Sequence, residues 1–286
     1  MIKHEASMTE KRKTSNFLSH TLLIVLSVIW LFPVFWVVLT SFRGEKGSYA
    51  PYFWPKTFTF DNYIKLFTET EQFYFAKWFS NTLVVAIFSC LLSTIFVLGI
   101  SYSLSRMRFR MRKPFLNVAL ILGMFPGFMS MIAIYYILKG LNITQSLLSL
   151  VLVYSGGAGL GFYIAKGFFD TIPKSIDEAA WIDGATKWKV FTKITVPLSK
   201  PIIIYTVLTS FIAPWTDYIF VSVIMGDSYD KYTVALGLYK MLEREFITNW
   251  YTRFAAGAVI VSIPIAILFI IMQRYYAEGV SGAVKG

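Results

Sequence analysis

Six charged side chains interrupt an otherwise apolar chain at residues 178–201: Glu178, Asp183, Lys187, Lys189, Lys193 and Lys200. The two histidines, His4 and His20, lie in the polar N-terminal segment, and the chain has no cluster of His, Asp and Glu at a membrane surface. This pattern disfavours a metal site and a membrane-embedded enzyme. A segment with several charges and one apolar side is typical of a docking surface for a soluble partner.

A second group with chemical potential is Trp215, Asp217 and Tyr218, which lies within the apolar run 201–224. An intramembrane carboxylate is costly and usually faces protein or water. Aromatic rings can stack on the C–H faces of a sugar, while carboxylate and hydroxyl groups bond its hydroxyls. These three residues are therefore a candidate substrate path for a carbohydrate. The alternative is that Asp217 is a helix-packing acid satisfied by a neighbour.

The glycine-rich run from Gly156 to Gly161 superficially resembles a G-x-G-x-x-G nucleotide-binding loop, but its flanks are apolar and no strand precedes it. The spacing of Gly157 and Gly161 favours close approach of helices instead. The pattern G-x-x-x-x-G-K-[ST] is absent from the sequence, so this chain has no P-loop of its own. Energy for any work must come from a partner or from an ion gradient.

The elements that hold these residues are predicted from composition. Of 286 residues, 56% are hydrophobic and 15% are charged, which exceeds the apolar content of a soluble domain. About 20 apolar residues cross a bilayer. The sequence therefore predicts an all-α, polytopic membrane protein with six transmembrane helices, at about 21–42, 78–102, 115–138, 146–168, 201–224 and 254–273. Met124 to Gly127 would weaken the third, either to line a passage or for packing alone.

Net charge of +11 could suggest nucleic acid, but the distribution of the charges argues against it. With an inside N-terminus, the inward segments carry 17 Lys and Arg and the outward ones carry 10. This asymmetry places both termini in the cytoplasm. It predicts an N-terminal tail (1–20), a transmembrane domain (21–273) with external segments at 43–77 and 225–253 and a cytoplasmic loop at 169–200, and a C-terminal tail (274–286).

The cytoplasmic loop reads as a helix, a tight turn and a second helix. Ser175 is a predicted cap for the first helix, Gly184 can end it in the left-handed conformation, and Thr186 can start the second. Val190, Phe191 and Ile194 would form one apolar stripe that fills a groove on the partner.

These features resemble the membrane subunits of ATP-binding-cassette (ABC) importers. The chain matches the pattern of their EAA loop at Glu178, Ala179, Ala180, Asp183, Gly184, Ala185, Phe191, Pro197, Leu198 and Pro201. Phe191, Pro197 and the segment from Gln273 to Gly286 are similar to the carbohydrate-importing branch, and to its MalG-type subunit most of all. The resemblance covers essentially the whole chain.

The resemblance implies the type I permease fold of ABC importers and a multi-pass location in the cell membrane of a prokaryote. It implies that residues 178–180 and 183–185, with Phe191, Pro197, Lys285 and Gly286, couple to an ATPase. The expected partners are a homologous permease in a heterodimer, two copies of a cytosolic ABC ATPase, an extracytoplasmic sugar-binding protein and membrane lipid, but no nucleic acid. The chain itself would bind no cofactor, since ATP and Mg²⁺ belong to the ATPase.

The resemblance also implies that the external segment 225–253 reaches the sugar-binding protein, with its tip near Glu243 to Trp250. Maltose or maltodextrin is the leading sugar, while raffinose-type, alginate-type and other oligosaccharides stay open. The competing class is an ion-coupled secondary transporter. Such a transporter requires ionisable residues near the bilayer midplane or inverted repeats, and Asp217 is the one acid within a span.

Overall fold

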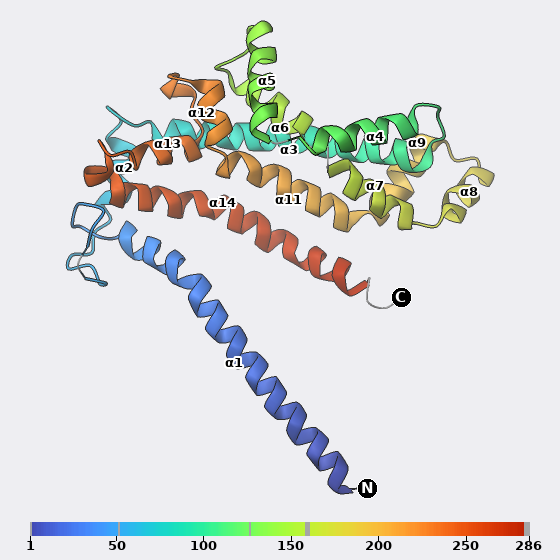
Figure 1. Ribbon diagram of the computed structural model, residues 1–286, viewed down its shortest axis with the longest axis horizontal. Helices are drawn as coiled ribbons and strands as arrows, with labels where there is room; N and C mark the ends of the chain where they lie inside the picture. Colours follow the sequence, from blue (N-terminus) through green and yellow to red (C-terminus); the bar gives the residue numbers. More distant parts are fainter. Residues whose placement is uncertain (1, 51, 126, 158–160, 283–286) are drawn as a thin grey trace. The chain divides into compact units, whose positions relative to one another are not determined.

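The computed structural model describes residues 2–50, 52–125, 127–157 and 161–282, and its regular elements within these ranges are helices, apart from one isolated bridge between Arg43 and Phe58. The prediction of an all-α protein is confirmed (Figure 1). The helices are α1 (Ile2–Ser41), α2 (Asp61–Thr68), α3 (Phe75–Arg106), α4 (Arg112–Gly123), α5 (Gly127–Gly140), α6 (Leu147–Gly156), α7 (Gly161–Thr171), α8 (Lys174–Ile182), α9 (Lys187–Val190), α10 (Val196–Leu198), α11 (Lys200–Thr216), α12 (Ile219–Met225), α13 (Val234–Met241) and α14 (Ile247–Gly282).

The chain divides into two compact units. Unit 1 comprises residues 1–68 and 241–259, and unit 2 comprises residues 69–240 and 260–286. In unit 1, the buried Asn62 amide donates to the carbonyls of Ser41 (2.9 Å) and Arg43 (2.8 Å), and Thr252 donates to Asn62 Oδ1 (2.9 Å). One side chain thus joins α2 to the end of α1 and the start of α14.

The connection between α1 and α2 in unit 1 also contains a carboxylate held by the backbone. The Thr57 amide donates to Glu45 Oε1 at 2.9 Å. Partial burial acts to raise the pKa of Glu45, but hydrogen bonds from the backbone around Glu45 and Thr57 outweigh this and lower the pKa below its usual value. These bonds stabilise the turn that follows α1.

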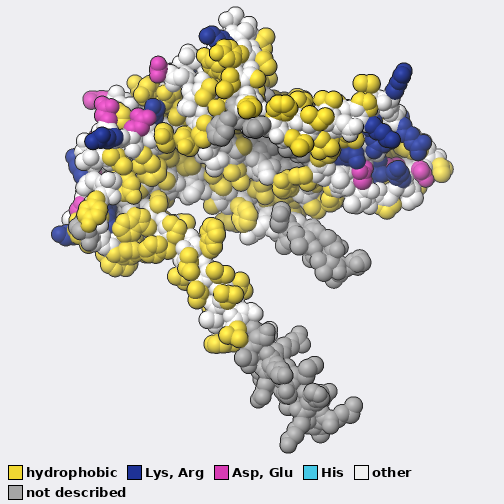
Figure 2. Space-filling model, in the orientation of Figure 1, with side chains coloured by type: hydrophobic (Ala, Val, Ile, Leu, Met, Phe, Trp, Pro, Cys, Tyr) yellow, Lys and Arg dark blue, Asp and Glu magenta, His cyan; other side chains and the backbone are white. Residues whose placement is uncertain are grey.

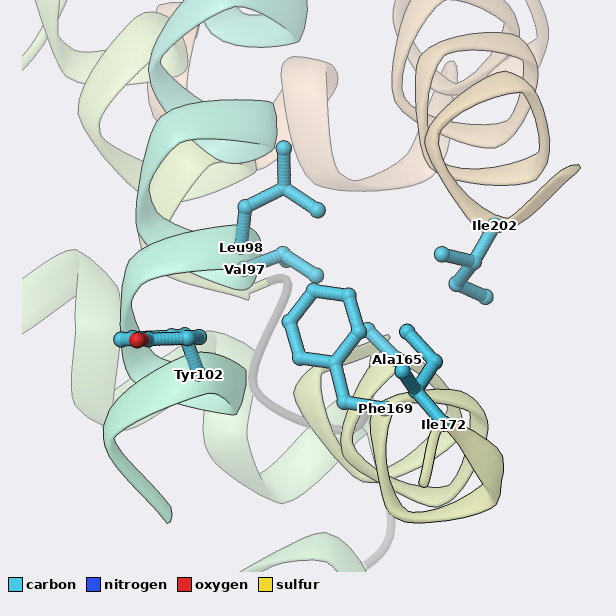
Figure 3. Close-up of a cluster of buried hydrophobic side chains, with 7 residues drawn as sticks. All are labelled: Val97, Leu98, Tyr102, Ala165, Phe169, Ile172 and Ile202. Atoms are coloured by element: carbon cyan, nitrogen blue, oxygen red, sulfur yellow. The ribbon is translucent and has the colours of Figure 1, made fainter. Parts of the chain in front are cut away.

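Unit 2 is organised around α3, which packs side by side with α11, α6 and α7 (Figure 1). Hydrophobic side chains cover much of the visible surface of unit 2, as expected for helices in contact with lipid, and Lys and Arg gather at the end that carries α8 and α9 (Figure 2). Figure 3 shows the buried cluster at that end of the bundle, where Leu98 and Tyr102 of α3 lie near Phe169 of α7 and Ile202 of α11. This cluster packs α3, α7 and α11 together at the end of the bundle that is next to the charged loop.

The prediction of six spans is not confirmed. Four helices in the described residues are long and apolar enough to cross a bilayer: Asn16–Ser41, Phe75–Arg106, Leu147–Thr171 and Ile247–Gln273. A fifth results if Lys187–Leu198 and Lys200–Thr216, which meet at a bend of 80°, count as one span. The structure therefore supports four to five spans by length and composition.

Breaks within the predicted helices explain the difference. The helix expected at 115–138 is divided between α4 and α5, of 12 and 14 residues, and Pro126 at the division lies outside the described residues. The helix expected at 201–224 is divided at Asp217 and Tyr218, after which α12 begins. Periodic hydrophobicity runs through such breaks unchanged, so composition alone joins the pieces.

One glycine is required by packing in unit 2. Gly237 of α13 lies against the fully buried indole of Trp78, and a Cβ at this position would overlap the ring. We expect Gly237→Ala to lower the free energy of unfolding by about 1–3 kcal/mol, measured as a lower thermal midpoint of the purified chain in detergent. Gly99→Ala in α3 is the matched control, because a Cβ there meets nothing within 4 Å. Equal midpoints for the two variants would show that the indole moves aside.

Candidate functional site

The charged loop forms a bent element that we call the elbow (residues 174–198, α8 to α10). Its first helix ends at Gly184, which has a φ of +78° as predicted. The amides of Ala185 and Gly184 donate to the carbonyls of Ala180 (2.9 Å) and Trp181 (3.0 Å). This pair of bonds is the Schellman C-cap, which requires a left-handed residue at position 184.

The second half of the elbow starts as predicted at Thr186, whose hydroxyl accepts from the Lys189 amide (3.3 Å). The prediction for Ser175 is wrong: α8 begins at Lys174, with Pro173 at its N-cap. Pro173 ends the preceding segment because it cannot continue a helix, and its fixed φ suits a helix start. A π-helical turn at Phe191–Thr195 leads to Pro197, which has no amide hydrogen for a helical bond.

The apolar stripe of the elbow faces the chain's own bundle, which corrects the sequence prediction. Val190 is fully buried, and the Phe191 ring lies 4.7 Å from the Tyr102 ring of α3. The most exposed large apolar side chains of the elbow are instead Ile182 (87% exposed) and Trp188 (71% exposed). Helical periodicity identifies an apolar face but does not identify what packs against that face. The sequence therefore predicted the apolar stripe correctly but not the surface that covers it.

The predicted coupling residues divide accordingly. Glu178, Ala179, Asp183, Gly184 and Pro197 are exposed, Ala180, Ala185 and Phe191 are half-buried, and Lys285 and Gly286 lie outside the described residues. The exposed group shares its surface with Ile182 and Trp188. This surface combines large apolar side chains with several exposed charged ones, which is typical of a protein docking site.

A buried ion pair that the sequence did not reveal fastens the elbow to α3. Arg106 Nε lies 3.1 Å from Asp177 Oδ2, and both side chains are 3% exposed. Arg106 Nη2 also donates to the carbonyl of Ile172 (2.8 Å). Arg106 is the first of five basic residues between positions 106 and 113, a run typical of the boundary between a membrane span and the lipid headgroups, but its side chain is inside the protein. Neither the residues next to Arg106 nor the position of Asp177 beside Glu178 indicates that these two side chains pair.

Further hydrogen bonds hold α3 to the elbow and to α7. The Tyr102 hydroxyl donates to the carbonyl of Lys187 (3.3 Å), and Ser105 donates to Asp170 Oδ1 (2.6 Å) at the end of α7. Beyond Ser199 the chain bends by 80° into α11. The elbow is therefore joined to α3 by side chains and to α11 by the backbone.

Both of these helices line a cavity of about 650 Å³ within unit 2. Its wall also includes residues of α5, α6, α7 and α12. Hydroxyl and carboxylate groups are set among aliphatic side chains at Ser93, Tyr154, Tyr205, Thr206, Thr209, Ser210 and Asp217.

Gly127 lies in the same wall, so the break between α4 and α5 borders the cavity. Gly157 borders it too, and a Cβ there meets nothing within 4 Å, which does not support the predicted close helix approach at this residue.

The predicted substrate group is separated by the fold. Asp217 lines the cavity, where it accepts from the Tyr154 hydroxyl (3.0 Å) and the Phe220 amide (3.0 Å). Trp215 is 3% exposed and packs against Phe79 with ring centroids 5.2 Å apart. Tyr218 stacks on Tyr239 at 4.4 Å. Of the three residues, Asp217 alone is a cavity residue, because the break in the helix turns its neighbours to other surfaces.

The tip expected at Glu243 to Trp250 is compact. The amides of Phe246 and Ile247 donate to the carbonyl of Glu243 (2.8 and 2.9 Å), and Trp250 is 7% exposed beneath the Arg253 guanidinium. Within the described residues, the connection between α13 and α14 is thus a short turn. A long reaching loop is not formed there.

Residues 95–282 match the family model described as binding-protein-dependent transport system inner membrane component. The match spans more than half of the chain and includes the elbow and the cavity helices. The chain belongs to this family, and its relatives identify it as the permease subunit of a carbohydrate ABC importer.

Among those relatives is the galactooligosaccharides transport system permease protein GanQ of Bacillus subtilis (strain 168), which is 34% identical over 98% of this chain and 99% of that protein. The maltodextrin transport system permease protein MdxG of the same organism is 32% identical, over 96% and 98%. The crystal structure of a bacterial ABC transporter involved in the import of the acidic polysaccharide alginate has a TM-score of 0.78 at 21% identity, over 92% of this chain and 97% of that one. This likeness confirms the ABC importer permease fold.

Proposed function

We propose that this chain is one transmembrane subunit of an ATP-driven importer of oligosaccharides. It would pair with a homologous permease, dock on two copies of a cytosolic ABC ATPase and receive sugar from an external binding protein. One similar solved structure is a bacterial alginate ABC transporter in complex with an alginate pentasaccharide-bound periplasmic protein. Galacto-oligosaccharides and maltodextrin are the leading substrates, by likeness to GanQ and MdxG.

The observation that carries this proposal is the continuous connection from the elbow to the cavity. The exposed side of the elbow offers Glu178, Ile182 and Trp188 to a soluble partner. Its inner side is tied to α3 through Asp177 and continues into α11. Movement of the docked ATPase would therefore move both helices as rigid bodies and alter the cavity between them.

The roles of the chain's own residues follow from this arrangement. Glu178 would pair with a basic residue of the ATPase, Ile182 and Trp188 would fill its groove, and Gly184 would set the angle between the two halves of the elbow. Hydrolysis of ATP with Mg²⁺ would take place in the ATPase. If α4 with α5, and α11 with α12, each cross the bilayer as one broken span, a cytoplasmic elbow would place both termini of the chain in the cytoplasm as well.

Reconstitution tests the proposal. The chain is co-purified with its partner permease and ATPase, placed in proteoliposomes with its binding protein outside, and supplied with labelled galacto-oligosaccharides or maltodextrins. ATP-dependent uptake, abolished in an ATPase variant that cannot hydrolyse ATP, is the expected result. Uptake by this chain without an ATPase, driven by an ion gradient, would establish the secondary transporter instead.

A further inference from the structure

The wall of the cavity has an unusual balance of charge. Among the lining residues that the structure describes there is no Lys, Arg or His, and Asp217 is the single carboxylate. Ion pairs to Asp217 are also absent from the described part of the chain. The cavity therefore holds one negative charge without a cation to balance it.

Asp217 is fixed at this wall by two donors. The Tyr154 hydroxyl bonds Oδ2 and the Phe220 amide bonds Oδ1, each at 3.0 Å. The Phe220 bond satisfies an amide in the first turn of α12, so the carboxylate has a structural reason to stay in place. A charge anchored in this way cannot turn aside to make room for a second anion.

The other polar groups of the wall suit uncharged hydroxyls. Thr206 and Thr209 donate to backbone carbonyls one turn earlier (2.8 and 2.9 Å), and Ser93 bonds Ser210 (3.0 Å). Hydroxyl oxygens engaged in this way retain lone pairs that can accept from a sugar. Aliphatic side chains such as Val97 and Ile164 provide the apolar part of the same wall.

We propose that this cavity admits neutral oligosaccharides and rejects acidic ones, with Asp217 as the residue that determines the selection by charge. A uronate entering the cavity finds no cation in this wall and meets the carboxylate of Asp217. This inference rests on the proposed function and specifies its substrate class. We therefore expect that the acidic polysaccharide named for the structural neighbour is not a substrate of this chain.

Saturation-transfer NMR on the detergent-solubilised complex, without the binding protein, tests the inference. The probes are a linear trimer of galactose and the matching trimer of galacturonic acid, which differ at C6. The neutral trimer is expected to bind with a Kd lower by at least about tenfold. Comparable Kd values for both probes, or no saturable binding of either, would overturn the inference. ATP-dependent uptake remains the independent test of the proposed function.

Two lysine variants assign the selection to this chain rather than to its partner permease. Thr209 is an exposed residue of the cavity wall, and Thr209→Lys is expected to improve the Kd of the acidic trimer by at least about tenfold. Thr68→Lys, on the exposed side of α2 in unit 1, is the matched control and is expected to leave both Kd values unchanged. An unchanged acidic Kd in Thr209→Lys, or an equal improvement in Thr68→Lys, would contradict the assignment.

Discussion

Asp177→Ala is expected to lower the free energy of unfolding of the chain by about 3–5 kcal/mol, because it leaves the Arg106 guanidinium buried without its counter-ion. It is also expected to reduce ATP-dependent uptake in proteoliposomes by at least about tenfold, since the elbow loses its attachment to α3. Thermal midpoints in detergent and initial uptake rates measure the two effects.

Asp230→Ala is the matched control for this variant. Asp230 pairs with Lys77 at 3.4 Å, but both side chains are more than half exposed, and an exposed pair contributes less than about 1 kcal/mol. The double variant Arg106→Met/Asp177→Leu separates the two roles, because removing the whole pair avoids an unpaired buried charge. We expect it to recover stability but not uptake. Full uptake in Asp177→Ala would contradict a coupling role for the ion pair.

Gly184→Pro is expected to abolish uptake while the chain still inserts into the membrane and assembles. Proline cannot adopt the φ of +78°, and it removes the amide that donates to Trp181. The Schellman cap is lost, and the two halves of the elbow no longer meet the ATPase together. The ATPase of the complex should continue to hydrolyse ATP without transport, so the ratio of sugar imported to ATP hydrolysed is the measurement.

Gly184→Asn is the control, since asparagine tolerates the left-handed conformation at a smaller cost. It should retain most of the uptake. Glu178→Lys gives a second approach to the same surface: it is exposed, so the fold should be unchanged, while pairing with a basic residue of the ATPase becomes repulsive. Normal uptake in both Gly184→Pro and Glu178→Lys would exclude the elbow as the coupling element.

The sequence predicted the local structure of the elbow well. The positions of Gly184 and Thr186 follow from backbone geometry that a few neighbouring residues decide, namely a left-handed cap and a hydroxyl acceptor. The all-α class and the apolar character also follow from composition, because a bilayer demands long apolar helices. The family pattern at residues 178–201 depends on order alone and is likewise visible in the sequence.

Tertiary structure decided which surface each residue occupies. Val190 and Phe191 face Tyr102 rather than a partner, Arg106 enters the protein rather than the lipid interface, and Trp215 is removed from the cavity that Asp217 lines. Each outcome depends on a neighbour distant in sequence. The number of spans depends in the same way on where α4, α5, α11 and α12 break. Periodicity determines that a face is apolar, but the free energy of packing between distant helices determines what covers it.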